Sequence, residues 1–470
     1  MVIKKIAYNT AWQVAGKTVT AGTALIYVFL LTRHLGTSGF GGFTTITTYL
    51  QFFGIIVDFG LTMIATQMLS IPNAPEKKTF DNIFTLKVIS AFFIFGPAVL
   101  IAWIATPYSL VIKIGITIAS ISFFINAVEQ VFVGWYQKYL LVPKLVTAEM
   151  ISRIAILAGM ISVVTAGGGL IALMPVLILG SGTYLFFTIY FIKNRYRPEL
   201  AFDKDVWKEI IKRSYPIALA IIFNLIYLKA DTLILSFIKS QGEVGLYGAA
   251  FRVLEALVTV PMMYFGLMLP LFTHAWEKGD FILWRSLYQK TFDIASIFII
   301  PLVLGGIVIA KPLMIMIAGM DFLVSADILK ILLLALLGIT ASSLFGYLIV
   351  SMNTQKKTIW IYALIAALGL TFYLIFIPRY SFWAAAAITL AAETSVALLT
   401  FLAVWKKSKF IPNFKKCVAS LIAGIIMLYI LNSIDIHFIF KIIVGALIYT
   451  AALIILLRKH PKTIIQELVF

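Results

Sequence analysis

The chain has 470 residues, of which 61% are hydrophobic and only 12% charged, and its mean hydropathy is +1.01. This composition excludes a water-soluble globular protein and predicts one membrane-embedded body. The formal net charge of +18 would suggest a nucleic-acid partner in a soluble protein, but in a membrane protein the basic residues must first be sorted by side.

Apolar runs long enough to cross a membrane, about 17 to 25 residues each, recur along the whole chain. They are solidly apolar and do not alternate with period two, which is not the pattern of an outer-membrane barrel. The runs begin near Asn9, Phe43, Phe84, Ser109, Thr147, Gly169, Tyr215, Gly245, Thr291, Ser325, Thr358, Ser381, Cys417 and Phe438. The sequence therefore predicts an all-α polytopic membrane protein with fourteen transmembrane helices.

Basic residues are concentrated in alternate loops. If the N-terminus is cytoplasmic, most of the 38 Lys and Arg residues fall in inside segments and few fall in outside segments. This bias predicts a multi-pass protein of the cytoplasmic membrane with both termini in the cytoplasm. It also accounts for most of the net charge, so nucleic acid is not expected as a partner.

An internal repeat indicates how the spans are grouped. Gly39-Phe40-Gly41-Gly42 opens the second span and corresponds, at an offset of 206, to Gly245-Leu246-Tyr247-Gly248 at the start of the eighth. Six spans per repeat is an even number, so the two copies share an orientation and form pseudo-symmetric lobes related by an axis along the membrane normal. The predicted parts are an N-terminal lobe (1–192), a basic cytoplasmic linker (193–214), a C-terminal lobe (215–404), and two further spans with a cytoplasmic tail (405–470).

Charged residues inside the spans are the candidate functional residues, because each costs about 2.5 to 3.5 kcal/mol to insert at a helix centre. Four cations are predicted to line a central substrate-binding cavity: Lys17, Arg153, Lys229 and Arg252. Five carboxylates are predicted to couple ions or to act as counter-ions, and the two roles stay open: Asp58, Glu129, Asp231, Glu255 and Glu393.

Spacing offers a structural alternative for some of these residues. Glu149 and Arg153 are four residues apart, and Arg252 and Glu255 are three apart, so each pair can form a salt bridge along one helix. Lys17 has no acidic neighbour within one turn and needs a partner from another span or from a ligand.

No catalytic residue, metal site or cofactor is predicted. The four histidines lie in loops or near span ends without grouped cysteines or carboxylates, and Cys417 is the single cysteine. A phosphate-binding loop of the Walker type is not found in the sequence. The sequence therefore does not suggest an enzyme.

Several segments resemble a known family. Asn9-Thr10-Ala11-Trp12, Leu35-Gly36-Thr37-Ser38-Gly39-Phe40-Gly41 and Asp58-Phe59-Gly60-Leu61 resemble the amino-terminal signature of the polysaccharide transporter family, the Wzx-type O-antigen flippases. Ala230-Asp231-Thr232-Leu233-Ile234-Leu235 and Gly245-Leu246-Tyr247-Gly248-Ala249-Ala250-Phe251-Arg252 are similar to its seventh and eighth spans. The resemblance covers most of the first twelve spans.

The resemblance implies the fold of the multidrug/oligosaccharidyl-lipid/polysaccharide (MOP) flippase superfamily, with two six-helix MATE-like lobes that alternate between inward- and outward-open states. It implies a polyisoprenyl-pyrophosphate-linked oligosaccharide as the substrate, bound by cavity cations, which Lys17, Arg153, Lys229 and Arg252 match by position and charge. Membrane lipids are expected as further partners, H+ or Na+ is left open as a coupling ion, and a monomer is expected.

The prediction is therefore a flippase that moves a lipid-linked oligosaccharide, such as an O-antigen repeat unit, to the outer leaflet through a cationic cavity. Three alternatives stay open. A cation-coupled multidrug exporter of the same superfamily would have acidic residues lining the cavity, and a lipid II flippase would share the fourteen-span count. A membrane glycan ligase or polymerase should have a long outside loop, and the outside loops of this sequence are short.

Overall fold

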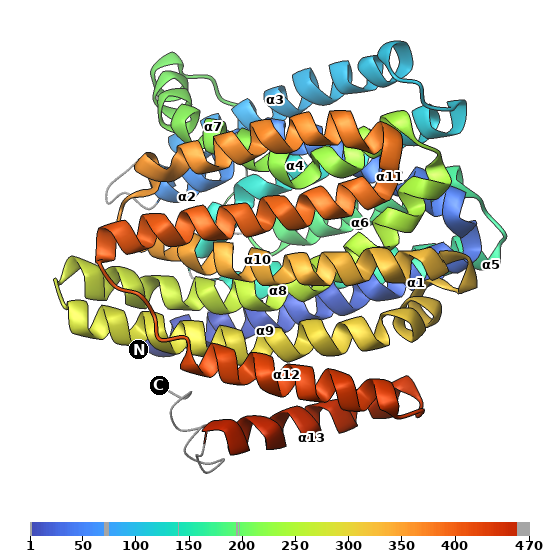
Figure 1. Ribbon diagram of the computed structural model, residues 1–470. Coiled ribbons are helices and arrows are strands. Elements are labelled where there is room, and N and C mark those ends of the chain that lie inside the picture. The colour runs from blue at the N-terminus through green and yellow to red at the C-terminus, as the bar shows by residue number, and fades with distance from the viewer. Residues whose placement is uncertain (1, 70–74, 140, 194–195, 197, 458–470) are drawn as a thin grey trace. The chain divides into compact units, whose positions relative to one another are not determined.

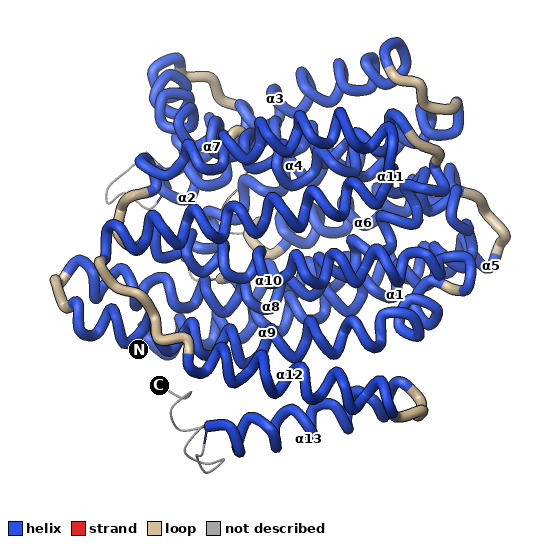
Figure 2. The backbone as a smooth tube through the Cα atoms, in the orientation of Figure 1, coloured by secondary structure: helices blue, strands red, loops and turns tan. Residues whose placement is uncertain are grey.

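The computed structural model of the protein describes residues 2–69, 75–139, 141–193, 196 and 198–457; inside the helices, the side chains of 2–11, 13–15, 17, 21 and 216–228 also lie outside the described set. Across these described residues the regular elements are all helices and no strand occurs (Figure 1, Figure 2). The helices are α1 (Val2–Asp58), α2 (Leu61–Leu69), α3 (Glu76–Ala105), α4 (Leu110–Lys138), α5 (Val142–Thr165), α6 (Leu170–Tyr190), α7 (Lys204–Ile238), α8 (Gln241–Glu277), α9 (Phe281–Ala318), η1 (Met320–Phe322), α10 (Leu323–Ser351), α11 (Gln355–Ser408), α12 (Lys415–Ser433) and α13 (Phe438–Leu457).

Eleven helices in the described part of the chain are long and apolar enough to cross a membrane. Two of them are of double length: α1 has 57 residues with a break at Gly36, and α11 has 54 residues with a break at Ser381. About 20 residues cross the hydrocarbon core, so each of these two bent helices is long enough for two crossings. The predicted all-α membrane fold is confirmed, and the count of fourteen spans stays a prediction.

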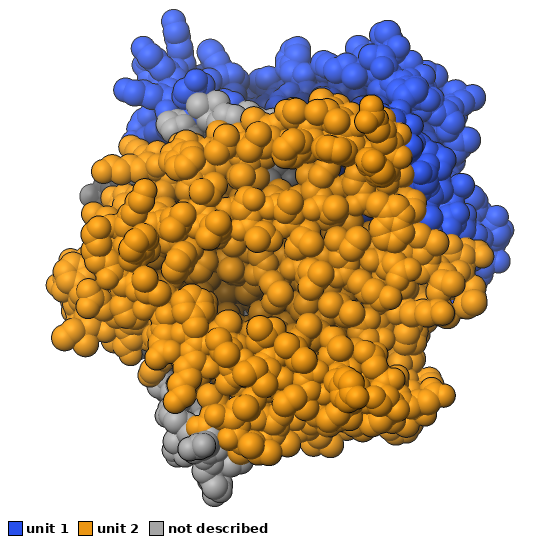
Figure 3. Space-filling view, in the orientation of Figure 1, with its two compact units in different colours: residues 1–248 blue, residues 249–470 orange. Residues whose placement is uncertain are grey.

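The chain separates into two compact units, residues 1–248 and 249–470, coloured separately in Figure 3. Unit 1 contains α1 to α7 and the first turns of α8, and unit 2 contains the rest of α8 and all later helices. The predicted lobe boundaries around the linker at 193–214 stay a prediction.

The core of unit 1 includes an aromatic cluster between α2, α3 and α4. Phe80 and Phe132 pack with ring centroids 5.4 Å apart, and Trp135 and Tyr136 are buried beside them. Ile210, from the first turns of α7, is fully buried in the same cluster. The end of the predicted linker is therefore part of a packed core.

In unit 2, residues of α8, α9, α10 and α11 surround the buried Trp284 and Tyr288. The last two helices pack on α9, and the Tyr449 hydroxyl of α13 donates a hydrogen bond to the Ile297 carbonyl oxygen (2.8 Å). At the start of α12, Lys416 forms an ion pair with the buried Asp293 of α9 (3.2 Å). The two C-terminal helices are thus anchored to α9 by both apolar and charged contacts.

The two glycine motifs of the internal repeat lie against each other within unit 1. A Cβ added to Gly41 would come within 1.6 Å of the Gln241 carbonyl oxygen, and one added to Gly245 within 2.0 Å of the Thr37 carbonyl oxygen. The contacts are reciprocal, as expected where equivalent helices cross at a local two-fold axis. They relate residues at an offset of 204, two residues from the offset at which the sequence motifs align.

Candidate functional site

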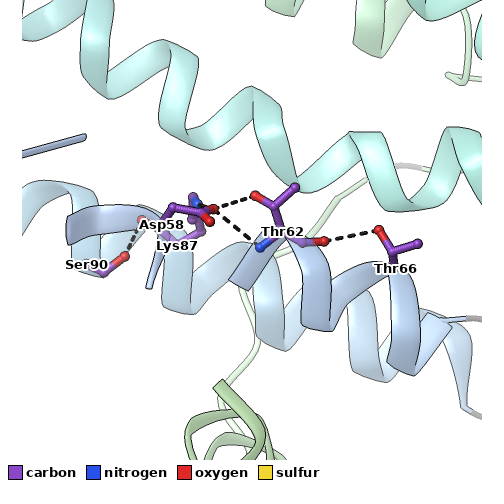
Figure 4. A network of polar contacts seen from close by, with 5 residues as sticks. All are labelled: Asp58, Thr62, Thr66, Lys87 and Ser90. Carbon is purple, nitrogen blue, oxygen red and sulfur yellow. Dashed lines mark hydrogen bonds and ion pairs between the residues drawn. The ribbon is translucent and has the colours of Figure 1, made fainter. Parts of the chain in front are cut away.

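A charged network in unit 1 connects the end of α1 with α2 and α3 (Figure 4). Asp58 is the last residue of α1, and the turn that follows at Phe59 and Gly60 has positive φ at both residues. This reversal brings Thr62 back to the carboxylate, to which its hydroxyl donates at 2.5 Å and its amide at 3.3 Å. Lys87 Nζ reaches the same oxygen of Asp58 at 2.5 Å.

The two partners of this ion pair differ in burial. The Lys87 side chain has no exposed surface, whereas the Asp58 side chain is 20% exposed. A fully buried ammonium is unfavourable unless it is paired, so Lys87 depends on its carboxylate for the charged form. Asp58 is therefore the ion-pair partner of Lys87, and its assignment as a coupling or counter-ion residue stays a prediction.

Glu129 of α4 is a second carboxylate near Lys87. Its side chain is buried, and its Oε1 atom has no hydrogen-bond partner among the described residues. The Tyr184 hydroxyl of α6 lies beside the carboxyl group. Unit 1 therefore encloses one buried ammonium near two carboxylates, of which Glu129 keeps an oxygen with unused hydrogen-bonding capacity.

Both salt bridges predicted from spacing are present. Arg153 Nη2 lies 3.4 Å from Glu149 Oε1 on α5, and Arg252 Nη1 lies 2.9 Å from Glu255 Oε2 on α8. In unit 1, Thr20 of α1 also donates to Glu149 (3.1 Å), which ties α1 to α5. The local pairing of these charges is confirmed.

The remaining predicted residues have different surroundings. Asp231 is buried and accepts hydrogen bonds from the Tyr247 hydroxyl and from the Thr232 amide, both at 2.5 Å. Lys229, two residues earlier on α7, is half-buried. The side chain of Lys17 lies outside the described residues.

Glu393 of α11 is buried in unit 2, where the Ser342 hydroxyl donates to it at 3.4 Å. Within the described chain, no three His, Cys, Asp or Glu side chains lie close enough together to hold a metal ion.

The sequence interpretation missed the role of Lys87. Its charge inside a span was visible, but Asp58 lies 29 residues away on another helix, so helical spacing gives no signal of the pair. The only available signal was that an intramembrane lysine needs a partner.

Comparisons with known proteins support the fold and the family. Residues 6–276 match the family described as polysaccharide biosynthesis proteins, which is more than half of the chain. The chain belongs to this family. No match to this sequence was found among curated proteins.

Several solved structures have a similar fold. The lipid II flippase MurJ, in an inward closed conformation, has a TM-score of 0.78 at 14% identity, and the match covers 96% of this chain and 99% of that one. An inward-facing multidrug resistance MATE transporter of the MOP superfamily has a TM-score of 0.69 at 13% identity, with 84% of this chain and 94% of that one covered. A MATE transporter of Vibrio cholerae has a TM-score of 0.56 at 15% identity, with 86% of this chain and 97% of that one covered.

The family match assigns this multi-pass membrane protein to the polysaccharide biosynthesis proteins, and the structural matches show that it shares the fold of the flippase and the transporters named above. The resemblance drawn from the sequence motifs is thereby confirmed.

Proposed function

We propose that this family member is a flippase that moves a lipid-pyrophosphate-linked oligosaccharide from the cytoplasmic to the outer leaflet. The observation that carries the proposal is the match of residues 6–276 to polysaccharide biosynthesis proteins, combined with a MOP-superfamily fold. The glycan would be an O-antigen or another polysaccharide repeat unit. Alternating access would carry the anionic head through a cationic cavity while the polyisoprenoid tail stays in lipid.

The arginines support this proposal by their remaining hydrogen-bonding capacity. A guanidinium has five N–H donors, and the salt bridges of Arg153 and Arg252 each use a single nitrogen. Their side chains are 33% and 26% exposed. Each arginine is thus held in place by a carboxylate on its own helix and retains surface with which to bind a phosphate oxygen.

The membrane potential supplies a driving force in the proposed direction. With the cell interior negative, outward movement of an anionic headgroup is favourable by about 2.3 kcal/mol per charge for each 100 mV. Inward return of an empty cationic cavity is favourable for the same reason. We propose that the protein resides in the cytoplasmic membrane as a monomer with both termini in the cytoplasm.

The test is a flipping assay with purified protein in liposomes that contain a fluorescent lipid-pyrophosphate-linked oligosaccharide. Movement between leaflets is measured by access of an impermeant glycan-modifying enzyme. In separate variants, Gln replaces one of four cations: Lys17, Arg153, Lys229 or Arg252. We expect the flipping rate of each variant to fall at least about tenfold, because each loses one charged hydrogen bond to the substrate, worth about 1.5 kcal/mol.

Lys330→Gln is the matched control, because this exposed lysine is paired with Asp327 on one helix and lies outside the predicted cavity. Full activity of all four cavity variants, in protein that is folded and inserted, would overturn the proposal.

A cation-coupled exporter is the second candidate, and the partner-free buried oxygen of Glu129, a feature of the described part of the chain, favours it. A buried carboxylate oxygen with unused hydrogen-bonding capacity can take up H+ or Na+. The assay is repeated under an imposed H+ or Na+ gradient with an organic cation, lipid II or the oligosaccharide lipid as cargo. Gradient-driven movement of the organic cation alone, lost in Glu129→Gln but not in Asp327→Asn, would establish the exporter instead.

A further inference from the structure

Residues 198–203, which precede α7, run along the start of α3 without helix or turn. Three alternate amides of this segment donate hydrogen bonds to side chains of α3: Glu199 to Asp81 (3.0 Å), Ala201 to Thr85 (2.8 Å) and Asp203 to Asn82 (2.7 Å). Side chains of an extended segment alternate between its two sides. The intervening Leu200 and Phe202 are 73% and 70% exposed.

Ion pairs fix the segment in this position. Lys77 pairs with Glu199 (2.9 Å), and Lys78 pairs with Asp203 (2.6 Å). The Tyr196 hydroxyl also donates to the buried Asp81. These hydrogen bonds and ion pairs therefore hold the segment in the orientation that exposes Leu200 and Phe202.

The first turns of α7 follow this segment directly, and the Trp207 ring of α7 packs against the Phe202 ring with centroids 4.8 Å apart. At 100° per residue, Lys204, Lys208, Lys212 and Tyr215 fall on one face of the helix, and all four are exposed. The opposite face carries Ile210, which is buried in the core of unit 1. The helix is therefore amphipathic, with a core face and a face of basic and aromatic residues.

The three lysines of this face have no acidic partner among the described residues. The acidic residues nearby are largely engaged elsewhere: Glu199 and Asp203 pair with α3, and Glu209 pairs with Arg213 at 2.5 Å. The basic face thus keeps its positive charge available.

The place of this face in the sequence brings it to the membrane surface. The first turns of α7, residues 204–214, precede the apolar part of the helix, which is the part that a hydrocarbon core would hold. The apolar part begins near Tyr215, so the preceding turns reach the headgroup layer or beyond. Figure 1 shows these turns in green at the upper left.

We propose that Leu200, Phe202, Lys204, Lys208, Lys212 and Tyr215 form a surface that binds anionic phospholipids of the cytoplasmic leaflet. The apolar side chains enter the boundary between headgroups and acyl chains, and the lysines pair with headgroup phosphates. We expect each lysine to enrich anionic lipid next to this surface about fivefold, which corresponds to the attraction between one basic residue and an anionic membrane surface.

The proposal is tested by lipid quenching on the full-length protein. Phe202→Cys is made in a Cys417→Ser background, labelled with an environment-sensitive fluorophore and placed in nanodiscs of phosphatidylcholine with or without phosphatidylglycerol. Brominated phosphatidylglycerol should quench the label at least about fivefold more efficiently than brominated phosphatidylcholine. The difference should shrink at high salt, because screening weakens exposed charge pairs.

Replacing Lys204, Lys208 and Lys212 with Gln should abolish the preference for the anionic lipid. The matched control makes the same change of charge at three exposed lysines elsewhere, Lys356, Lys357 and Lys406, and should leave the preference unchanged. The proposal would be overturned if neither brominated lipid quenched the label, or if both quenched it equally. It would also be overturned if the label were protected from a soluble quencher but not quenched by either lipid. The assay measures no glycan transport, so it stands independently of the proposed function.

Discussion

Asp58→Asn should destabilise unit 1 strongly, because it removes the charge that compensates the buried Lys87 ammonium. The charged atoms are 2.5 Å apart, so at an effective dielectric constant of 20 their attraction is about 7 kcal/mol before desolvation is counted. Removal of one partner of a buried pair costs about 3 to 5 kcal/mol. Because Lys87 has no exposed surface and Asp58 is 20% exposed, Asp58→Asn should lie at the upper end and Lys87→Met at the lower.

The free energy of unfolding is measured on the detergent-solubilised protein by denaturant titration with tryptophan fluorescence. The double variant Asp58→Asn/Lys87→Met should recover most of the loss, since neutral replacement of both partners removes the unpaired charge. Asp327→Asn is the control, because it breaks an exposed pair worth at most about 1 kcal/mol. A loss below about 1 kcal/mol for Asp58→Asn, or a double variant as unstable as the two losses added, would refute the reasoning.

Three further predictions concern contacts at the ends and along the sides of the helices. Reversing either charge of the Glu149–Arg153 bridge should cost on the order of 1 kcal/mol, and exchanging the two residues should restore stability; failure of the exchange would indicate that a ligand holds the arginine. The hydrogen bond from Lys78 holds the pKa of Asp203 below its usual value of 3.8. The contribution of Asp203 to stability is therefore complete above pH 3.8 and is lost as the pH falls through the lowered pKa. Protease cleavage of the linker should rise as the pH falls through this range, and Asp203→Asn should flatten that rise. Gln289→Ala removes two hydrogen bonds to the backbone of the loop before α12 (3.0 and 2.6 Å) at about 1 kcal/mol each, which should speed cleavage of that loop.

Hydropathy located some of the helix boundaries and missed others. The twelfth span was predicted to begin at Ser381, where α11 has its break, and the fourteenth at Phe438, where α13 begins. By contrast, α9 begins at Phe281, ten residues before the predicted Thr291. Its first turns mix apolar residues with Arg285, Gln289 and Lys290, and the Asp280 carboxylate caps them by accepting from the Leu283 amide. Such overhangs depend on capping and tertiary packing, which a count of apolar residues does not detect.

The charged residues of the candidate site form both local contacts, within one helix, and distant contacts, between helices. The bridge between Glu149 and Arg153 follows from helical spacing and was predictable. The pair of Lys87 and Asp58 joins two helices through a turn whose geometry is set by positive φ at its two residues, and no spacing rule encodes it. Sequence therefore identified the pair that helical spacing encodes, and the fold was needed to identify the pair that joins two helices.

The glycine crossing in unit 1 gives the most stringent test of the internal repeat. A Cβ at Gly41 would meet a backbone oxygen at 1.6 Å, which no side-chain rotation can relieve, so Gly41→Ala should cost about 3 kcal/mol or more in unfolding free energy. Gly245→Ala should cost a similar amount, because the contacts are reciprocal. Gly22→Ala, where the added atom meets nothing within 4 Å, is the matched control. Either substitution alone already forces the same two helices apart, so the double variant should lose clearly less than the sum of the two. Additive losses would mean that the two glycines lie in independent contacts, and the local two-fold relation would then be wrong.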